Sequence, residues 1–547
     1  MPPAPWPAGP VAVLGAGPVG QTTALLLARW GVPSVVLDRR PRRDAVGSRA
    51  ICQQRDVLDV WESVGAGARI AAEGVTWTTA RTFHRDAELF SYAFEEPGRP
   101  AFPPFVNISQ TRTEQVLDER IAAEPLVDLR WDHRVVDLAQ DGDGVVLRCA
   151  TAGGPVEVRA PYAVVCGGAR SEDLRTRLGV SFEGHSFDDR FLICDVRTDL
   201  PGWARERRFY FDPEWNPGRQ VLIHPCPDSV FRIDWQVPAD HDLDAEVASG
   251  ALDARVRRIV GDRPYEIVWR SVYRFQSRRA DRMRVGRVLL AGDAAHLVSP
   301  FGARGLNSGV ADAENAAWKI AWVGRGWAPP SLLESYHDER HAAARENIDV
   351  TTATMDFLVP QDDERARHRA DVLARAATDP AARAAVDSGR LAEPFWYVAS
   401  PLTTPDPARP FAGRPPRGQV PPAGPGVLLP DAPVCTPPGR ARALARDGFL
   451  LLTTDAAGAA AARDAAAAVP GPVRVLALAD LDADADGALA SALAARPGEV
   501  WVVRPDAHVA AVLGTPTAND LTAALHRAAG HPSTREESHY GVLQASG

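Results

Sequence analysis

The feature that most constrains this chain lies near its start, where a strand, a glycine turn, a helix and a second strand follow one another. The apolar run Val11–Leu14 leads directly into Gly15-Ala16-Gly17-Pro18-Val19-Gly20, a G-x-G-x-x-G match. An Ala- and Leu-rich segment, residues 21–30, is typical of a helix that stops at Gly31. A second apolar run then ends in Asp38. This order predicts a β-α-β unit that binds a dinucleotide.

Each part of this unit has a physical role at a nucleotide. Gly15 allows the tight turn, Gly17 lets the backbone approach a pyrophosphate, and Gly20 lets helix and strand pack closely. The helix N-terminus offers free N–H groups to the phosphates, and Asp38 can accept hydrogen bonds from a ribose diol. With 44 glycines in 547 residues a chance match is the alternative interpretation. The position of the motif inside a β-α-β unit that ends in an acid favours the nucleotide site.

Arginines follow this unit directly, at Arg39, Arg40, Arg42 and Arg43. A solvated loop and a cluster of charge beside a nucleotide phosphate both explain such a run.

Length and charge narrow the classes of protein. A chain of 547 residues is longer than one hydrophobic core usually serves, so we expect two to four structural units. The net charge of −9 gives no reason to propose nucleic acid or a membrane as a partner. The six cysteines have neither C-x-x-C nor metal-type spacing, and the chain has no signal-like or membrane-spanning segment. We therefore expect a cytoplasmic protein with free thiols and no metal site.

Two later strands also run into glycine and small polar residues. The first is followed by Gly167-Gly168-Ala169-Arg170-Ser171 and the second by Gly292-Asp293. A loop over residues 299–309, rich in proline and glycine, is expected to deliver the N-terminus of a helix over residues 310–323. For His296, between them, a structural histidine is a better interpretation than a catalytic base.

Between these junctions the pattern alternates. We expect strands over residues 130–136, 145–149 and 156–158, an amphipathic helix over 111–123, and a strand-rich region over 185–275. In residues 230–237, Phe231, Ile233 and Trp235 alternate with polar residues, which predicts a sheet with one covered and one polar face. Such a face can cover a cavity, although its aromatic residues can equally be ordinary sheet packing.

The rest of the chain predicts helices to about residue 391, a surface linker over residues 394–433, and a smaller α/β unit. In that unit residues 449–453, 473–478 and 500–503 are expected strands, and residues 519–529 an expected helix.

The three glycine-containing junctions together resemble the single-component FAD-dependent aromatic hydroxylases, the p-hydroxybenzoate hydroxylase superfamily. The branch with phenol hydroxylase and 3-(3-hydroxyphenyl)propionate hydroxylase is the most similar. The resemblance implies an α/β fold in which a Rossmann-like FAD-binding domain is interleaved with a mixed β-sheet substrate domain. It places these domains in residues 1–360, with substrate parts at about 75–106 and 185–280. A helical segment and linker over 361–424 and a thioredoxin-like domain over 425–547 would follow. Without C-x-x-C, that last domain is expected to serve packing or homodimer contacts.

The resemblance also assigns residues to FAD. Gly15, Gly17 and Gly20 would hold the pyrophosphate, Asp38 the adenosine ribose, Arg49 a phosphate or the path of a mobile flavin, and Asp293 the ribityl hydroxyls. Gln110, on the helix that bears Glu114, would lie along the ribityl chain, and the backbone at Gly305, Leu306 and Asn307 would face the pyrimidine edge of the flavin. The other expected cofactor contacts are Pro18, Val19, Arg39, Gly292 and Pro300.

The implied reaction is hydroxylation of a phenolic or polycyclic aromatic substrate by O₂ through a flavin C4a-hydroperoxide, with FAD reduced by NADPH or NADH. His224, Tyr210 and Arg232 are the candidates to contact a substrate phenolate. Gly167 stands where the family motif Asp-Gly-Ala-x-Ser has its Asp, a residue implicated in FAD and NAD(P)H contacts, so the route of flavin reduction stays open. Same-fold dehydrogenase or Baeyer–Villiger chemistry, and a flavin-binding protein without turnover, are the alternatives. A halogenase is disfavoured, because Lys319 is the only lysine in the chain.

Overall fold

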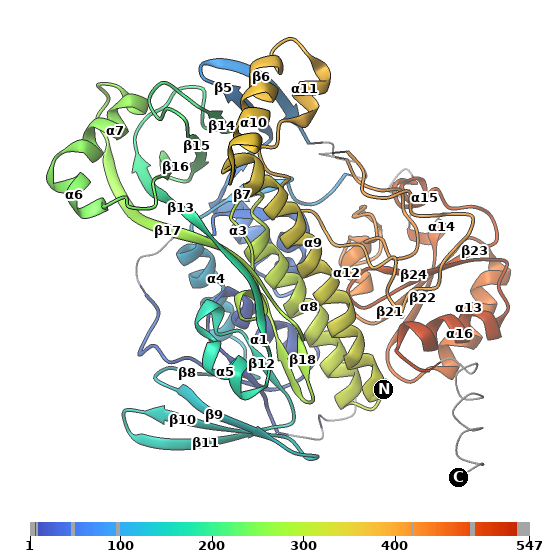
Figure 1. The fold of residues 1–547 in the computed structure, drawn as a ribbon. Coiled ribbons are helices and arrows are strands. Elements are labelled where there is room, and N and C mark those ends of the chain that lie inside the picture. The colour runs from blue at the N-terminus through green and yellow to red at the C-terminus, as the bar shows by residue number, and fades with distance from the viewer. Residues whose placement is uncertain are drawn as a thin grey trace.

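The computed structural model describes residue 6 and residues 9–44, 50–94, 99–416, 419–481 and 487–532. Of Asp188 only the backbone is described. These residues form five β-sheets, with long helices in the middle of the molecule and a separate α/β unit at the C-terminal end (Figure 1). The mixed α/β fold predicted from the sequence is confirmed.

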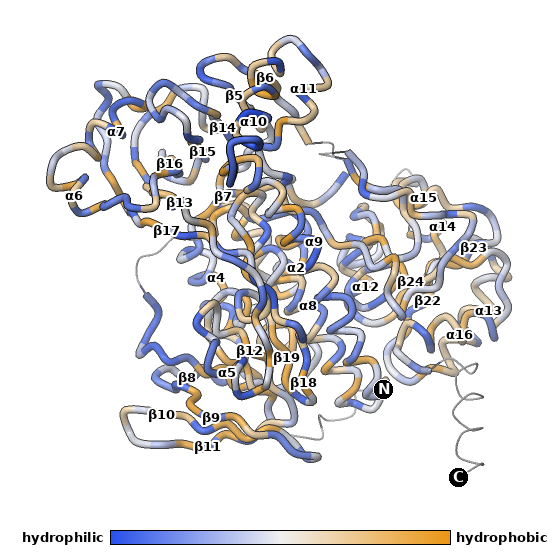
Figure 2. The backbone as a smooth tube through the Cα atoms, in the orientation of Figure 1, coloured by the Kyte–Doolittle hydropathy of each residue, from blue (hydrophilic) through white to orange (hydrophobic). Residues whose placement is uncertain are grey.

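A six-stranded sheet carries the glycine turn. Its order is β18-β19-β12-β1-β2-β8, and all neighbours are parallel except the first pair. The strands are β1 (Val11–Leu14), β2 (Ser34–Leu37), β8 (Val127–Arg130), β12 (Ala163–Val165), β18 (Arg284–Val285) and β19 (Val288–Leu290). All four residues of β1 and of β2 are buried, which is why these strands are continuous apolar runs. Figure 2 shows hydrophobic segments, in orange, around the buried strands β12 and β19 of the same sheet.

Helices and a small antiparallel sheet pack against this parallel sheet. The main helices are α1 (Pro18–Arg29), α2 (Arg55–Glu62), α3 (Gly67–Glu73), α4 (Gln110–Ala122), α5 (Glu172–Arg177), α8 (Arg304–Gly324) and α9 (Glu334–Leu358). The antiparallel sheet is β9 (Arg134–Gln140), β10 (Val145–Thr151) and β11 (Gly154–Ala160). In the turn between β9 and β10, Asp141 accepts the backbone N–H groups of Asp143 and Gly144. Leu147 and Cys149 share one buried cluster with Val11 and Val13.

An eight-stranded sheet of order β20-β17-β13-β16-β15-β14-β5-β6 forms a second layer. Its strands are β5 (Thr79–His84), β6 (Ala87–Ala93), β13 (Phe182–Arg197), β14 (Glu206–Phe211), β15 (Gln220–Cys226), β16 (Val230–Val237), β17 (Glu266–Ala280) and β20 (His296–Leu297). Helix α7 (Ala251–Val260) packs its Leu252, Val256 and Val260 on one face, and α6 (Leu243–Ala248) precedes it. A three-stranded sheet of order β3-β7-β4 contacts β15; its strands are β3 (Cys52–Gln54), β7 (Phe105–Asn107) and β4 (Val75–Trp77).

The C-terminal unit has a four-stranded sheet of order β22-β21-β23-β24, in which only β21 and β22 are parallel. The strands are β21 (Phe449–Thr453), β22 (Val473–Ala477), β23 (Glu499–Val503) and β24 (Val509–Gly514), and the helices are α12 (Ala441–Ala445), α13 (Ala456–Ala468), α14 (Leu478–Leu481), α15 (Ala488–Leu493) and α16 (Ala518–Ala528). Figure 1 shows this unit, in orange and red, beside α8 and α9. Helices α10 (Asp363–Arg375) and α11 (Pro380–Ala385) follow α9 and lie at its C-terminal end.

Three local predictions are wrong. The strand expected over 130–136 is two strands in different sheets, because Asp132 adopts a φ of +58° and residues 131–133 turn. The helix expected from residue 310 already begins at Arg304, so Gly305 and Gly309 are helical. The linker over 394–433 has no helix or strand in its described part, but it is not confined to the surface, since Tyr397 and Leu429 are buried.

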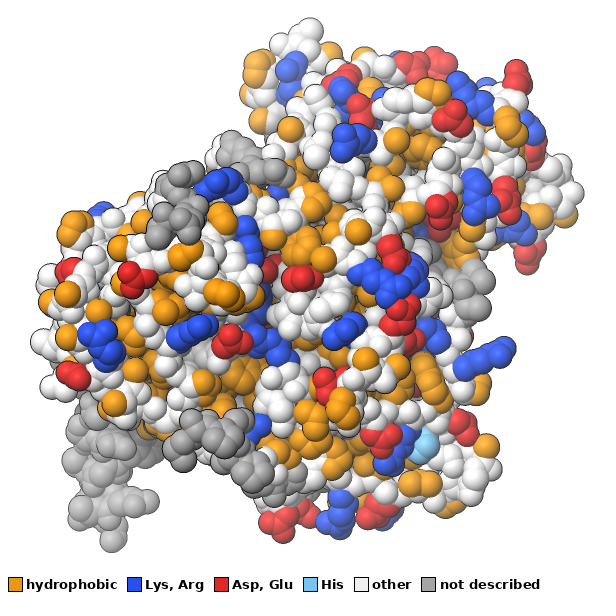
Figure 3. Space-filling view, turned by 180° about the vertical axis from the view of Figure 1, so that it is seen from behind, with side chains coloured by type: hydrophobic (Ala, Val, Ile, Leu, Met, Phe, Trp, Pro, Cys, Tyr) orange, Lys and Arg blue, Asp and Glu red, His pale blue; other side chains and the backbone are white. Residues whose placement is uncertain are grey.

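No helix in the described ranges is both long enough and apolar enough to cross a membrane. On the face drawn in Figure 3, acidic and basic side chains are interspersed.

Candidate active site

One cavity of about 1010 Å³ extends from the glycine turn after β1 to the eight-stranded sheet. Most of the residues predicted to contact FAD line it: Gly15, Gly17, Pro18, Val19, Asp38, Arg39, Gln110, Asp293, Pro300, Gly305 and Leu306. Gly20, Gly292 and Asn307 do not line it, and Arg49 lies outside the described residues. The cavity therefore joins the predicted nucleotide site to the predicted substrate sheet.

Two glycines of the glycine turn are required by packing, and the third is not. A Cβ on Gly15, which has a φ of +113°, would lie 2.6 Å from the carbonyl oxygen of Cys166, and one on Gly20 would lie 1.9 Å from that of Gly15. A Cβ on Gly17 would meet no atom within 4 Å. Gly17 is also the N-cap of α1 and gives it no side-chain cap, so the first N–H groups of the helix are left for a ligand. This cradle fits a pyrophosphate.

Asp38 anchors the far side of the cradle. Its carboxylate accepts the backbone N–H of Ala16 at 2.8 Å and is paired with Arg40. Burial acts to raise the pKa of Asp38, but the hydrogen bonds from Arg40 and Ala16 outweigh it and lower that pKa. The arginine run is thus not simply a solvated loop: Arg39 and Arg40 line the cavity, and Arg43 forms an ion pair with Glu114.

The N-terminus of α8 closes another side of the cavity. Ala303 is its N-cap, with a φ of +56°, and Gly305 and Leu306 of the first turn line the cavity. Arg304 also lines the cavity, and its guanidinium donates to the carbonyl oxygens of Arg390 and Leu391. The uncapped first turn presents N–H groups and the positive end of the helix dipole.

Two expected contacts act through packing. A Cβ on Gly292 would lie 3.0 Å from Val19 Cγ2, so this glycine lets the segment after β19 pass close to the first turn of α1. The Asn307 side chain accepts the N–H of Gln54 and donates to the carbonyl oxygen of Cys52, both at 3.0 Å. Asn307 therefore ties β3 to α8 and does not line the cavity.

The eight-stranded sheet presents its polar face to the cavity, as the period-two pattern predicts. Phe231, Ile233 and Trp235 belong to the apolar cluster on the other face, while Arg232 and Asp234 line the cavity. Across the strands, His224 is the neighbour of Arg232, and Arg232 that of Asp195. One row further, Asp234 lies between Leu222 and Ile193.

The three substrate candidates have different fates. His224 lines the cavity, and its Nδ1 has no hydrogen-bond partner among the described residues. Burial lowers the pKa of His224 well below its usual value, with smaller effects from Arg207 and Arg232, so the ring is neutral. Arg232 also lines the cavity and is bound to Asp195 through Nε at 2.8 Å and Nη2 at 2.9 Å.

Tyr210 is a wrong prediction. It lies on the covered face, stacked on Phe83 with 4.6 Å between ring centroids, and its hydroxyl accepts from Arg208 Nη1 at 3.2 Å. Side chains alternate along β14, so Arg207 and Phe209 face the cavity side instead.

Sequence reasoning missed Asp234. Its side chain lines the cavity, and its Oδ1 is buried without a hydrogen-bond partner among the described residues. Burial raises the pKa of Asp234 to about 7, and the repulsion of Asp195 adds to this while Arg232 and Arg207 oppose it. The signal was available, because the alternation of residues 230–237 puts Asp234 on the same face as Arg232.

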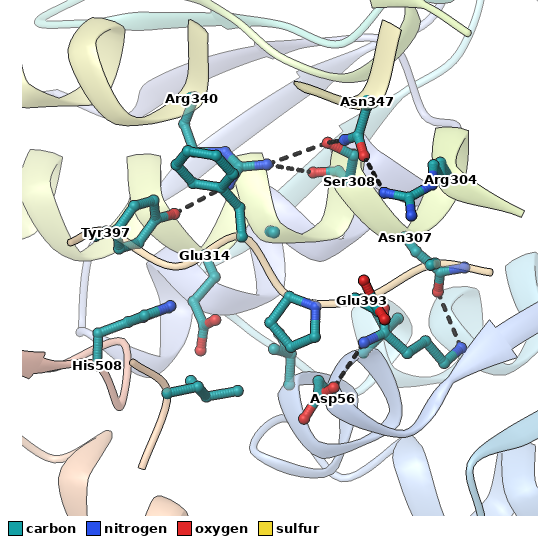
Figure 4. Close-up of a pocket in the computed structure, with 18 of the residues that line it drawn as sticks. Asp56, Arg304, Asn307, Ser308, Glu314, Arg340, Asn347, Glu393, Tyr397 and His508 are labelled. Atoms are coloured by element: carbon teal, nitrogen blue, oxygen red, sulfur yellow. Dashed lines mark hydrogen bonds between the residues drawn. The ribbon is translucent and has the colours of Figure 1, made fainter. Parts of the chain in front are cut away.

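A second, much smaller cavity of about 60 Å³ lies where α8 meets residues 392–397 and the C-terminal unit (Figure 4). Two of its arginines are hydrogen-bonded to neighbouring polar residues: Arg340 donates to Tyr397 Oη at 3.0 Å and to Ser308, and Arg304 donates to Asn347 at 2.8 Å. Close by, His296 Nε2 lies 2.8 Å from Asp312, with both side chains fully buried. That pairing gives His296 a structural role.

Comparison with known proteins agrees with this geometry. The family model described as FAD binding domain matches residues 9–351, and the one described as aromatic-ring hydroxylase, C-terminal, matches residues 423–532. The chain belongs to the FAD-dependent aromatic hydroxylase family. A 3-(3-hydroxy-phenyl)propionate/3-hydroxycinnamic acid hydroxylase from Mycobacterium sp. (strain JLS) is 30% identical over 352 residues, which cover 64% of this chain and 60% of that protein. The chain thus spans about 60% of the length of this relative.

The chain is also similar to proteins with other named activities. A dialkyldecalin synthase from Streptomyces rugosporus is 34% identical over 339 residues, covering 61% of this chain and 69% of that protein. Among solved structures, the flavin-dependent monooxygenase PieE in complex with FAD and substrate has a TM-score of 0.82 and 26% identity, covering 96% of this chain and 99% of that one. Aklavinone-11 hydroxylase with FAD and aklavinone has a TM-score of 0.75 and 26% identity, covering 95% and 98%.

Proposed function

We propose that this aromatic hydroxylase family member is an FAD-dependent monooxygenase that hydroxylates a phenolic or polycyclic aromatic substrate. O₂ would be the oxygen source, and NADPH or NADH the reductant. The observation that carries the proposal is the single cavity of about 1010 Å³, which connects the pyrophosphate cradle to the polar face of the eight-stranded sheet. A flavin ring bound from the cradle would end beside that face, where an aromatic ring has room to meet it.

The residues divide into two sets by what they would do. Gly17, the first turn of α1, Asp38 and Asp293 would hold the nucleotide and ribityl parts of FAD, and the N-terminus of α8 at Gly305 would face the flavin. Bound there, FAD would carry electrons from the reduced nicotinamide to O₂ and supply the oxygen-transfer chemistry.

The sheet side supplies positioning and dryness. Phe191, Ile193, Leu222, Phe275 and Phe301 line the cavity and would hold an aromatic ring by apolar contact while excluding water. His224 and Arg232 would fix its polar substituents by hydrogen bonds. A correctly oriented ring needs few other groups, because proximity and orientation supply much of the rate acceleration.

The source of the electrons is the finer part of this proposal. Gly167 lines the cavity and has no carboxylate to offer a nicotinamide nucleotide. A Cβ at this position would lie 2.8 Å from Ser171 Oγ, a buried hydroxyl that donates to the carbonyl oxygen of Gly168. An acid at this position would therefore require the Ser171 side chain to move, and the proposed reduction would use contacts from other residues.

A second candidate function is non-hydroxylating chemistry on the same scaffold, either dehydrogenation or a Baeyer–Villiger-type oxygenation. The relative named dialkyldecalin synthase supports keeping it, since a synthase shares this domain at 34% identity. For the C-terminal unit we propose a packing role without thiol chemistry, because Cys435 is its one cysteine.

Anaerobic reduction of the FAD-loaded protein tests the proposal. NADPH or NADH is added with and without a panel of phenols and naphthols, and the visible absorbance of the oxidised flavin is followed. We expect bleaching that one class of phenol accelerates. No bleaching with either nucleotide, despite bound FAD, would contradict NAD(P)H dependence, and bleaching that no phenol changes would favour the second candidate.

A further inference from the structure

We propose that Asp234 is a catalytic residue that accepts the proton of an acidic hydroxyl group on the bound aromatic substrate. This inference rests on the proposed function and deepens it, since it names the substrate as a phenol-type acid. It also replaces Tyr210, which faces away from the cavity.

The position of Asp234 in the sheet carries the argument. Its neighbours across β15 and β13 are Leu222 and Ile193, both apolar residues that line the cavity. An aromatic ring held against these two side chains would place a ring substituent at the carboxylate between them. The rest of this row is uncharged in the described sheet, with Ser271 beyond Ile193 and with Phe209, Thr82 and Phe90 beyond Leu222.

The charged groups around Asp234 leave its carboxylate available. On its own strand, Arg232 is held by both oxygens of Asp195 from β13. On β14, Arg207 donates to the carbonyl oxygen of Ser388 at 3.2 Å, and His224 on β15 is neutral. In the next row Gln236 donates to Asp189. Asp234 Oδ1 receives no hydrogen bond from any described residue.

Buried acids without a partner are costly, so their persistence needs a reason. Asp195, one row away, shows the ordinary solution, a bidentate pair with arginine. For Asp234 a ligand hydroxyl would supply the missing donor. The pKa of about 7 matches a group that takes up and releases a proton near neutral pH.

The proton balance is simple. The substrate O–H bond breaks, its electron pair stays on the oxygen as phenolate, and the proton forms the Oδ–H bond of Asp234. The ring becomes more electron-rich and thus a better acceptor of an electrophilic oxygen atom. The acid then returns the proton to the product oxygen or to solvent, so that no net proton is retained.

The test compares Asp234→Asn with the wild type, both as FAD-loaded full chains. Asp228→Asn is the matched control, because it makes the same charge change in the β15–β16 turn of the same sheet, at an exposed residue outside the cavity whose φ of +60° suits Asn. The probes are 2-naphthol and its methyl ether, which has no acidic proton. Binding is measured by fluorescence and flavin absorbance between about pH 5 and about pH 9, and difference infrared spectra follow the carboxyl group.

In wild type and in D228N we expect 2-naphthol to bind more tightly as the pH rises through about 7, where ionised Asp234 becomes the acceptor. In D234N this dependence is lost and binding above that pH weakens about tenfold to hundredfold, the effect of one hydrogen bond to a charged group. The methyl ether should bind equally to all three. A carboxyl infrared band should titrate near pH 7 in wild type and be missing in D234N.

The proposal is overturned if D234N keeps the 2-naphthol profile of wild type, or if no such carboxyl band is found. When that happens while phenols still accelerate flavin reduction in wild type, Asp234 alone is wrong and the hydroxylase proposal stands. If neither 2-naphthol nor any phenol binds, both proposals fall together.

Discussion

Two regions of this molecule bury titratable side chains, and only one of them gives those side chains hydrogen-bond partners from the protein. At the junction between α8, α9 and the C-terminal unit, Glu339 accepts from Lys319 at 2.7 Å, from Arg504 at 3.0 Å and from Asn315 at 2.8 Å. On the cavity face of the eight-stranded sheet, Asp234 Oδ1 and His224 Nδ1 have no hydrogen-bond partner among the described residues.

The difference separates residues that hold the fold together from residues that are available to bind a ligand. A buried ion network whose partners all come from the protein fixes one arrangement of domains, and here Arg504 of the network lies over the ring of Trp318. A buried acid or imidazole left without a partner lowers stability unless something binds it. We therefore take a titratable side chain that lines the cavity and lacks a protein partner, and not burial or charge alone, as the sign of a substrate-facing residue in this chain.

The largest effect is expected where the network is complete. Glu339→Ala leaves Lys319 and Arg504 buried without their shared acid and should lower the free energy of unfolding by about 3–5 kcal/mol. Urea unfolding followed by tryptophan fluorescence measures this. Asp371→Asn, which breaks an exposed i,i+4 pair with Arg375, is the control and should leave stability nearly unchanged. Equal effects of the two variants would remove the contrast drawn above.

The opposite sign is expected on the sheet. Asp234 has a folded-state pKa of about 7, above its ordinary value of 3.8, so between these values the folded protein holds more protons than the unfolded chain. Its contribution to stability therefore falls as the pH rises through this window, by up to about 1.4 kcal/mol per pH unit. Asp234→Asn should remove this slope and unfold at higher denaturant concentration than wild type at about pH 8. A variant less stable than wild type at that pH would show that the protein itself satisfies the carboxylate.

Gly20 and Gly17 of the glycine turn make a comparable contrast, because the space beside Gly20 is filled by protein and the space beside Gly17 is open. Gly20→Ala drives a Cβ to 1.9 Å from the carbonyl oxygen of Gly15 and should destabilise the protein by about 1–3 kcal/mol before any FAD is added. Gly17→Ala meets no atom, so the apoprotein should unfold within about 0.5 kcal/mol of wild type.

Because the open space above Gly17 is where a pyrophosphate would lie, G17A should weaken FAD binding by about tenfold or more. Fluorescence titration of the apoprotein with FAD measures it. Unchanged FAD affinity in G17A would place the pyrophosphate elsewhere.

The smallest effect is expected on the covered face of the sheet. Tyr210→Phe removes one hydrogen bond, that from Arg208 at 3.2 Å, and should lower stability by about 0.5–1.5 kcal/mol. Because the ring does not line the cavity, the affinity for 2-naphthol should stay as in wild type. A loss of affinity like that expected for D234N would show that the two faces of the sheet have been assigned the wrong way round.

Much of this architecture could be predicted from local patterns. The G-x-G-x-x-G turn, Asp38 and the strands around them follow from short-range sequence, and so does the two-faced sheet, because the alternation in β16 fixes which side chains share a face. The start of α8 was missed because glycines suggest a loop. Gly309 is instead a helical residue that lets α8 pass Val19, since a Cβ on Gly309 would lie 2.6 Å from Val19 Cγ2.

The remaining features depend on residues far apart in the chain. Whether Asp234 or Asp195 has an arginine partner depends on strand register and on side-chain reach, which the spacing of residues does not give. The junction around Glu339 joins α8, α9 and residue 504, and only the folded chain brings these together. The face on which Tyr210 lies also required the register of β14 against β15.

The most direct test of the account is the fate of oxygen. The FAD-loaded protein is turned over with reduced nicotinamide nucleotide, the phenol that most accelerates flavin reduction, and O₂ labelled with the heavy isotope, and the product is analysed by mass spectrometry. The account predicts a hydroxylated product carrying one labelled oxygen atom in wild type and far less of it in D234N. Hydrogen peroxide as the sole product with every phenol, or a product without the label, would contradict a monooxygenase.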